Sequence, residues 1–274
     1  MTQEFKLLAV LAHPDDESLG FGGTLAKYAA EGVEAHLVTA TRGERGRFGS
    51  QGKTAEPPEV GRVRETELRA AAATLGIHDV TNLGYPDGAV DQVDAATAVR
   101  IIAWHIRRIR PHVVVTFGPE GGYGHPDHIA ISQFTAAATV CASDSAYRTH
   151  DGFDSGPLRP HRVAKLYYLA WRNEKWTAYQ SAFRELTSMV DGVARQATPW
   201  PDWAVTTEIG TSAYWPIVWK AVCCHQTQIS IYERLGQLAE EQQRALWGSQ
   251  EFYRAYSAVN GGRKLETDLF EGLR

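Results

Sequence analysis

The feature that most constrains this chain is an apolar run at residues 7–12, which ends directly in the segment His13-Pro14-Asp15-Asp16-Glu17. A continuous apolar run of this length is typical of a strand buried on both faces of a sheet. An imidazole and three carboxylates directly after the strand indicate a site where the chain leaves the core. Taken alone, the segment is equally compatible with an ordinary helix start, with Pro14 in the first turn and Asp15 or Asp16 as the cap.

A second apolar run ends in the same kind of residues. Residues 113–117 are apolar apart from Thr116, and they are followed by a glycine-rich stretch and then by His125-Pro126-Asp127-His128. Two strand-like runs that each end in His and Asp favour a shared site over two separate helix starts.

The order of the predicted elements indicates the fold class. Because strands and helices alternate, the sheet should be mainly parallel with right-handed crossovers. We predict an α/β, Rossmann-like, doubly wound sheet with helices on both faces, an elaborated C-terminal part and strand order 3-2-1-4-5. In that order strands one and four are neighbours, so the two motifs face each other across the crevice at the switch point. The expected strands are residues 6–12, 33–39, 79–83, 112–117, 163–171 and about 203–208; the expected helices are 20–31, 59–75, 91–110, about 127–142, 175–191, 215–225 and 229–245.

Length and composition limit the domain organisation and the partners. At 274 residues we expect a single domain over 1–274, with a variable substrate-specificity region at about 143–274. A net charge of −4 gives no support to a nucleic-acid partner. The chain has no apolar run of about 20 residues and no leader-like start, so we expect no membrane span and a cytoplasmic location. The three cysteines fit buried thiols.

Two further stretches carry expectations. Residues 42–58 are rich in Gly, Pro and charge, and they read as a long loop that serves as a lid or binding loop or is disordered. Residues 143–159 also read as a loop. Seven of the eight tryptophans lie from Trp171 onward, where we expect them to pack a C-terminal layer, with one or two near the crevice.

The two motifs together supply the donors of a catalytic metal site. His13, Asp16 and His128 give two imidazoles and one carboxylate, a set that leaves a position open and suits Zn²⁺, with Fe²⁺ as the competitor. Asp15 is placed to act as general base and later to protonate the leaving amine. His125, if cationic, is placed to stabilise a tetrahedral oxyanion. This chemistry predicts a metal-dependent amidohydrolase.

Three alternatives remain open at this point. A dinucleotide-dependent oxidoreductase fits the fold, but the turn after the first strand has acids where that class needs glycines. A non-enzymatic metal- or ligand-binding protein would use the same ligands, although it would not need Asp15 or His125. A hydrolase of another amide is also compatible with the residues.

The motifs resemble those of the LmbE/PIG-L family of zinc-dependent de-N-acetylases, which includes N-acetylglucosaminyl-phosphatidylinositol deacetylases and deacetylases of mycothiol and bacillithiol synthesis. Further segments agree with the family in order along the chain, most firmly up to about residue 140. One residue departs from the family pattern, because Thr227 stands where a serine is usual. The segments are Ala12-His13-Pro14-Asp15-Asp16-Glu17, Thr41-Arg42-Gly43-Glu44-Arg45-Gly46, Arg64-Glu65-Thr66-Glu67, Tyr85-Pro86-Asp87-Gly88, His125-Pro126-Asp127-His128 and His225-Gln226-Thr227-Gln228.

The resemblance implies an N-deacetylase that acts on an N-acetylglucosamine-type sugar or its conjugate, a small-molecule partner. It implies zinc on His13, Asp16 and His128, Asp15 as base and His125 as oxyanion support. It adds Tyr123 as a group that polarises the substrate carbonyl. Arg64, Asp87 and Glu44 are implied as substrate-binding residues. Many family members are oligomers, so a homo-oligomer is a further expectation.

Overall fold

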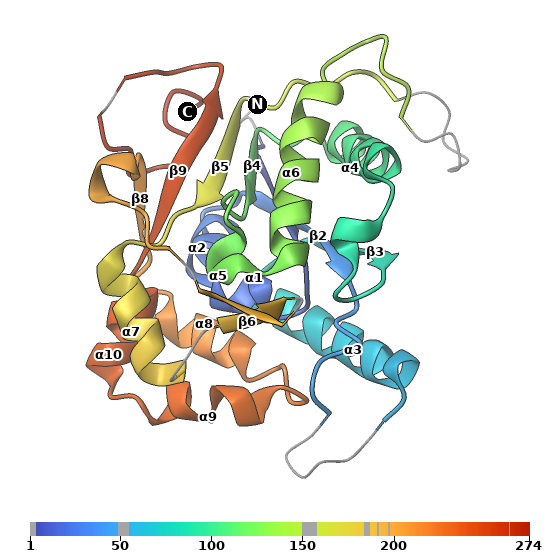
Figure 1. Cartoon of the computed structure of the whole chain (residues 1–274). Coiled ribbons are helices and arrows are strands. Elements are labelled where there is room, and N and C mark those ends of the chain that lie inside the picture. Colours follow the sequence, from blue (N-terminus) through green and yellow to red (C-terminus); the bar gives the residue numbers. More distant parts are fainter. Residues whose placement is uncertain are drawn as a thin grey trace.

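A seven-stranded, mostly parallel sheet forms the centre of the computed structural model (Figure 1), which describes residues 4–48, 55–149, 158–183, 187–190, 192–196, 198–262 and 264–274. The strand order is β3-β2-β1-β4-β5-β9-β8, and the first five strands run parallel. β9 and β8 extend the sheet as antiparallel strands. The strands of the sheet are β1 Lys6–Leu11, β2 Glu34–Thr41, β3 Asp79–Tyr85, β4 Val113–Thr116, β5 Lys165–Leu169, β8 Thr207–Gly210 and β9 Ser249–Ser257, and β6 Thr187–Val190 forms a separate hairpin with β7 Val193–Gln196.

Helices cover both faces of the parallel part of the sheet. α4 and α6 pack together on one face, whereas α2, α3 and α8 pack together on the other. This arrangement follows from right-handed crossovers that change face after β3. The helices are α1 Asp16–Leu19, α2 Gly22–Ala30, α3 Pro57–Leu75, α4 Ala95–Ile109, α5 Gly121–Gly124, α6 Pro126–Cys141, α7 Asn173–Phe183, α8 Trp215–Val222, α9 Ile229–Gln237 and α10 Glu240–Trp247, with short 3-10 turns at Val90–Gln92 and Asp202–Ala204.

The predicted fold class and the order 3-2-1-4-5 are confirmed. β1 is the middle one of the five parallel strands. It pairs with β2 on one side and with β4 on the other, so that Leu7 lies between Ala35 and Val113. The side chains of residues 7–12 have no solvent exposure, as the continuous apolar run predicts. The two motifs therefore follow neighbouring strands at the same edge of the sheet.

Two predicted helices are wrong in extent because the chain leaves the helical conformation within each predicted range. The helix expected at 175–191 ends at Phe183, and residues 187–190 pair instead with residues 193–196 in the β6–β7 hairpin, with Gly192 at φ 77°. A two-residue connection with a glycine in the left-handed region favours a hairpin. The helix expected at 229–245 divides into α9 and α10 because Leu238 and Ala239 are extended.

Other boundaries shift for identifiable reasons. The helix expected at 91–110 begins at Ala95, because the Asp94 side chain accepts a hydrogen bond from the Thr97 amide and caps the helix there. The strand expected near 203–208 is β8, which follows a 3-10 turn. β9 is absent from our expectations, because its nine residues do not alternate between buried and exposed positions.

The two predicted loops lie partly outside the described residues. For residues 42–58, positions 49–54 lie outside, while the last two positions already belong to α3. For residues 143–159, positions 150–157 lie outside. A lid or binding loop at 42–58 stays a prediction.

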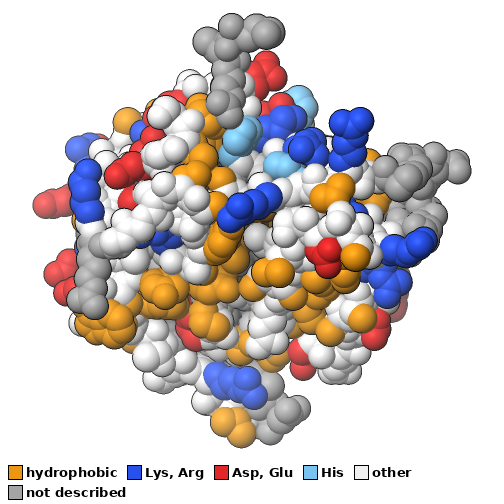
Figure 2. All heavy atoms as spheres, turned by 90° about the horizontal axis from the view of Figure 1, so that it is seen from above, with side chains coloured by type: hydrophobic (Ala, Val, Ile, Leu, Met, Phe, Trp, Pro, Cys, Tyr) orange, Lys and Arg blue, Asp and Glu red, His pale blue; other side chains and the backbone are white. Residues whose placement is uncertain are grey.

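The surface and the helices bear on the expected partners. In the view of Figure 2, Lys and Arg side chains form small groups that apolar and acidic side chains separate. Within the part of the chain that the structure describes, no helix is both long and apolar enough to cross a bilayer.

A buried ionic network ties the added strands to the parallel sheet. Glu266 accepts hydrogen bonds from Lys165 on β5 and from Thr207 on β8, and it pairs with Arg254 on β9 at 2.9 Å. Lys165 and Glu266 are both almost completely buried. Burial alone would raise the pKa of Glu266. The hydrogen bonds from Lys165 and other donors outweigh burial and lower this pKa to about 2.

We predict that Glu266→Gln lowers the free energy of unfolding by about 3 kcal/mol at pH 7, because the Lys165 ammonium would be left buried without its counter-charge. The ionised carboxylate stabilises the fold fully above its ordinary pKa of 4.5 and loses this contribution as pH falls toward 2. The difference between wild type and variant should therefore shrink over that range in urea titrations. Glu240→Gln, which alters an exposed pair with Arg244, is the control and should change stability by less than about 0.5 kcal/mol.

Candidate metal centre and active site

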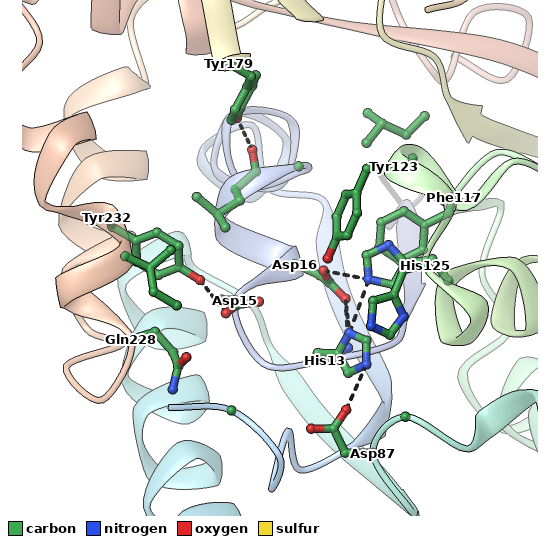
Figure 3. Close-up of a pocket in the computed structure, with 18 of the residues that line it drawn as sticks. His13, Asp15, Asp16, Asp87, Phe117, Tyr123, His125, Tyr179, Gln228 and Tyr232 are labelled. Atoms are coloured by element: carbon green, nitrogen blue, oxygen red, sulfur yellow. Dashed lines mark hydrogen bonds and ion pairs between the residues drawn. The ribbon is translucent and has the colours of Figure 1, made fainter. Parts of the chain in front are cut away.

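The site is a cavity of about 410 Å³ at the carboxyl ends of β1 and β4. After β1 the chain turns sharply at Asp15, whose φ of 103° lies in the left-handed region, and then enters α1 at Asp16. After β4 the chain passes through α5 and enters α6, which carries His128 in its first turn. Figure 3 shows side chains from both segments pointing into one space.

The three predicted metal ligands lie together. His13 Nδ1 is 3.2 Å from His128 Nε2 and 3.7 Å from Asp16 Oδ2, and His128 Nε2 is 3.4 Å from Asp16 Oδ1. Ligands about 2.1 Å from a tetrahedral zinc ion are themselves about 3.4 Å apart. The donor types and their separations therefore fit one zinc ion.

A carboxylate pair fixes the orientation of His13. Its Nε2 lies 3.0 Å from Asp127 Oδ2 and 3.2 Å from Asp87 Oδ1. Asp127 is itself held by the backbone amides of Gly88 and Val90. Since Nε2 carries the proton that these carboxylates bind, the lone pair of Nδ1 faces Asp16 and His128, as a metal ligand requires.

The electrostatics favour a cation at this point. Burial alone would lower the pKa of His13. Hydrogen bonds with Asp127 and Asp87 and the charge of Asp16 outweigh burial and raise this pKa to about 10. Burial raises the pKa of Asp16 to about 7, although His13 opposes this effect. Burial and the charge of His13 lower the pKa of His128 well below its ordinary value, which keeps its imidazole neutral. A field that binds a proton so firmly also favours a divalent metal, and metal binding would displace that proton.

Two other groups of donors lie close enough to compete for a metal. One combines His13 and His128 with His125, and the other combines His13 with Asp87 and Asp127. The second group would use His13 Nε2, the nitrogen that these carboxylates already hold by hydrogen bonds. The predicted set uses the opposite nitrogen and leaves those bonds intact.

Asp15 is held by two donors. Arg64 donates to Asp15 Oδ2 at 2.9 Å, and the Tyr232 hydroxyl donates to the same oxygen at 2.5 Å. The Asp15 amide donates to Glu17, whose carboxylate forms a fully buried pair with His225 at 2.8 Å. A left-handed aspartate costs about 1–3 kcal/mol and persists only where its surroundings fix it. These contacts supply that support.

The residues expected to bind substrate are largely occupied within the protein. Arg64, only 4% exposed, donates to the carbonyls of Gly43 and Pro14 as well as to Asp15. Asp87 holds His13 and accepts from the Arg45 amide. The Glu44 carboxylate accepts from the Asp87 amide, and Glu44 is not among the cavity-lining residues. The structure thus places Arg64, Asp87 and Glu44 around the turn at Asp15, with Arg64 and Asp87 at the cavity wall.

His125 and Tyr123 lie beside the ligand cluster. The ring of His125 is 4.8 Å from that of His13, and the ring of Tyr123 is 5.3 Å from that of His128. Burial and the charge of His13 lower the pKa of His125 to about 4. The oxyanion role that we expected of His125 if it is cationic would need the charged form, which this environment disfavours. Its Nδ1 accepts from the Asp127 amide, so the neutral ring carries its proton on Nε2.

Sequence reasoning missed several residues that shape the site. Tyr232 on α9 had no motif of its own, although it lies one turn after Gln228, which ends a recognised motif and also lines the cavity. Glu17 was noted only as part of the acidic segment, but its pairing with His225 joins the first and last motifs. Trp171 lines the cavity, which confirms the expectation of a tryptophan near the crevice.

Comparison with known proteins decides the family. Residues 8–139 match the family model described as PIG-L: GlcNAc-PI de-N-acetylase. Over 256 residues the chain is 36% identical to the 1D-myo-inositol 2-acetamido-2-deoxy-alpha-D-glucopyranoside deacetylase of Thermobifida fusca, covering 82% of this chain and 84% of that relative. The chain belongs to the PIG-L family. The family prediction is confirmed, and with it the prediction of a deacetylase-type hydrolase.

Solved structures show the same PIG-L fold. The N,N'-diacetylchitobiose deacetylase of Pyrococcus horikoshii matches with a TM-score of 0.66 at 19% identity, over 91% of this chain and 83% of that one. GalB, the 4-carboxy-2-hydroxymuconate hydratase of Pseudomonas putida KT2440, also gives a TM-score of 0.66, at 20% identity over 94% of this chain and 99% of that one. Since both identities are low, the likeness concerns the fold alone.

We predict that substitutions separate the three candidate ligand sets. Loss of a residue that only hydrogen-bonds to a metal ligand typically weakens metal affinity about 10- to 100-fold. If His13, Asp16 and His128 hold the metal, Asp16→Asn and His128→Ala should each weaken zinc affinity by more than this. His125→Gln should stay within about 10-fold of wild type. Calorimetric zinc titration measures all three. Strong zinc binding by Asp16→Asn together with loss in His125→Gln would assign the metal to the three histidines instead.

Proposed function

We propose that this protein is a zinc-dependent deacetylase that removes the N-acetyl group from an N-acetylglucosamine-type sugar conjugate. The observation that carries the proposal is the placement of Asp15 beside the convergent donors of His13, Asp16 and His128 in one cavity. Figure 3 shows His13, Asp15 and Asp16 in this cavity. The family membership supports the same reaction class.

The donor set suits zinc, since two imidazoles and one carboxylate leave a position open for solvent or substrate. Zinc held there would lower the pKa of water and polarise the amide carbonyl. Ferrous iron accepts the same donors, and the metal content of the purified protein distinguishes the two.

In this proposal Asp15 carries the proton. It takes a proton from the attacking water and later gives it to the leaving amine, so that the amide C–N bond breaks and acetate and a free amine form. We assign this transfer to Oδ1, because Oδ2 already accepts hydrogen bonds from Arg64 and Tyr232. These two donors keep the carboxylate in one orientation while it accepts and releases the proton.

His125 and Tyr123 are placed to stabilise the oxyanion that forms during attack. A neutral His125 with its proton on Nε2 donates a hydrogen bond without needing a positive charge. Burial and the nearby carboxylates of Asp16 and Asp15 raise the pKa of Tyr123, so its hydroxyl keeps its proton and remains a donor. Both proposed roles follow from the positions of these side chains and from the protons that they keep.

A non-enzymatic metal-binding protein accounts less well for Asp15. Metal ligation needs no second carboxylate in a left-handed turn, and strained backbone of this kind is concentrated at functional sites. The dinucleotide alternative is disfavoured because an acidic turn repels a pyrophosphate group. The proposed substrate is a small molecule, and we propose that the protein acts in the cytoplasm.

We predict that Asp15→Asn keeps stoichiometric zinc and lowers kcat by about 10²- to 10⁴-fold, the range that general base catalysis contributes. Acetate release from an N-acetylglucosamine conjugate measures the activity, with a chelated sample as blank. Asp202→Asn is the matched control, since the Asp202 side chain is 89% exposed. Full activity in Asp15→Asn, or loss of its zinc, would refute the assigned role.

We also predict that Tyr232→Phe lowers kcat about 10-fold, because loss of one hydrogen bond to a charged group costs about 1.5 kcal/mol. Zinc content and KM should stay near wild type, since the change acts through the orientation of Asp15. Tyr256→Phe, at the far end of the sheet where β9 pairs with β5, is the control. An equal fall in both variants would mean that Tyr232 has no specific role.

A further inference from the structure

The cavity has a second wall that takes no part in the chemistry described above. We call Leu19, Leu169, Trp171, Tyr179 and Ile231 the apolar wall, and all five line the same cavity as the metal ligands. They come from α1, from the end of β5 and the residues after it, and from α7 and α9. In Figure 3, Tyr179 and Asp87 lie at opposite ends of the site, with Asp15, Asp16 and His13 between them.

The apolar wall is a rigid aromatic surface. The rings of Trp171 and Tyr179 stack with centroids 4.4 Å apart at 10°. The Tyr179 hydroxyl donates to the Leu19 carbonyl at 2.7 Å and accepts from Trp247 Nε1 at 3.1 Å. The polar atom of Tyr179 is therefore used inside the protein, and its ring is held in place.

Two polar side chains next to the apolar wall already donate hydrogen bonds within the protein. Gln228 donates its amide to the Arg47 carbonyl and to Thr227, and the Tyr232 hydroxyl donates to Asp15. A polyol placed here would give up hydrogen bonds to water and meet mainly aliphatic and aromatic carbon. An apolar ring would gain from the same surface.

We propose that the apolar wall is the binding subsite for an apolar, ring-bearing aglycone on the N-acetylated sugar. This inference rests on the proposed deacetylase function and defines its substrate class. The sugar amide reaches the metal ligands and Asp15, and the aglycone packs on Trp171. This differs from the inositol that the name of the Thermobifida fusca relative specifies.

The space beside the metal ligands argues against a long acyl chain as the apolar group. Phe117 stacks on His128 with ring centroids 4.0 Å apart. The hollow that continues from Phe117 behind Leu169 and Trp171 has a volume of only about 10 Å³, so a long chain does not fit there. That is room for roughly one water molecule. The apolar wall is therefore assigned to the aglycone and not to the acyl group.

The test compares zinc-loaded wild-type protein on three 2-acetamido-2-deoxy-α-D-glucopyranosides: phenyl, methyl and myo-inosityl. We expect kcat/KM for the phenyl glycoside to be at least about 10-fold higher than for each of the other two. The difference should come mainly from a lower KM, because burial of the phenyl ring strengthens binding. In Trp171→Ala the ratio of phenyl to methyl should fall below about 2, whereas Trp203→Ala, at a tryptophan 85% exposed and outside the cavity lining, should keep the wild-type ratio.

Ile231→Asn gives a second variant of the apolar wall if Trp171→Ala does not fold, and it should reduce the same ratio. Equal or better turnover of the inosityl glycoside, or a ratio unchanged in both wall variants, would overturn the subsite. A gain on N-butyryl over N-acetyl phenyl glycosides would move the apolar group to the acyl side and overturn it as well. If none of the three glycosides releases acetate, the proposed function fails and the subsite with it, whereas turnover without phenyl preference refutes the subsite alone.

Discussion

The hydrogen bond between His13 Nε2 and Asp127, at 3.0 Å, is the contact on which the site depends. It joins the end of β1 to the start of α6, and the same carboxylate binds the amides of Gly88 and Val90 after β3. Three chain segments that are distant in sequence thus meet at one carboxyl group. Because the bond fixes the proton on Nε2, the opposite nitrogen faces Asp16 and His128, and the ligand geometry follows from a group that is not itself in the predicted ligand set.

The turn at Asp15 depends on the C-terminal third of the chain. α9 supplies the Tyr232 hydroxyl, and the loop before it supplies His225, whose buried pair with Glu17 supports the Asp15 amide. Burial alone would raise the pKa of Glu17, but the charge and hydrogen bond of His225 outweigh burial and lower this pKa. The Glu17–His225 pair therefore stays ionic. α9 therefore holds the proposed base in place through Tyr232, and it also contributes Ile231 to the apolar wall.

The sequence predicts the parts of this structure that depend on periodicity and on chemistry at strand ends. The buried run at residues 7–12 and the alternation of strands and helices led to the correct order of the first five strands, and that order brought His13, Asp16 and His128 together. Contacts that depend on side-chain direction were not predictable in this way. Arg64 and Asp87 line the cavity, and substrate binding by them stays a prediction, but their hydrogen bonds to Asp15 and His13 were not foreseen. Tyr232 reaches Asp15 from a sequence separation of 217 residues, which no local pattern reveals. The β6–β7 hairpin was missed because strands of four residues carry little periodicity, and β9 was missed because its residues do not alternate between buried and exposed positions.

The most direct measurement of the central claim is zinc-edge anomalous diffraction from crystals of the zinc-loaded protein. The account predicts a single strong peak within about 2.0–2.2 Å of His13 Nδ1, His128 Nε2 and a carboxylate oxygen of Asp16, with the hydrogen bond from His13 Nε2 to Asp127 retained. A peak bound instead by His13 Nε2, Asp87 and Asp127 would contradict it, because the lone pair of His13 would then point away from the cavity where Asp15 lies.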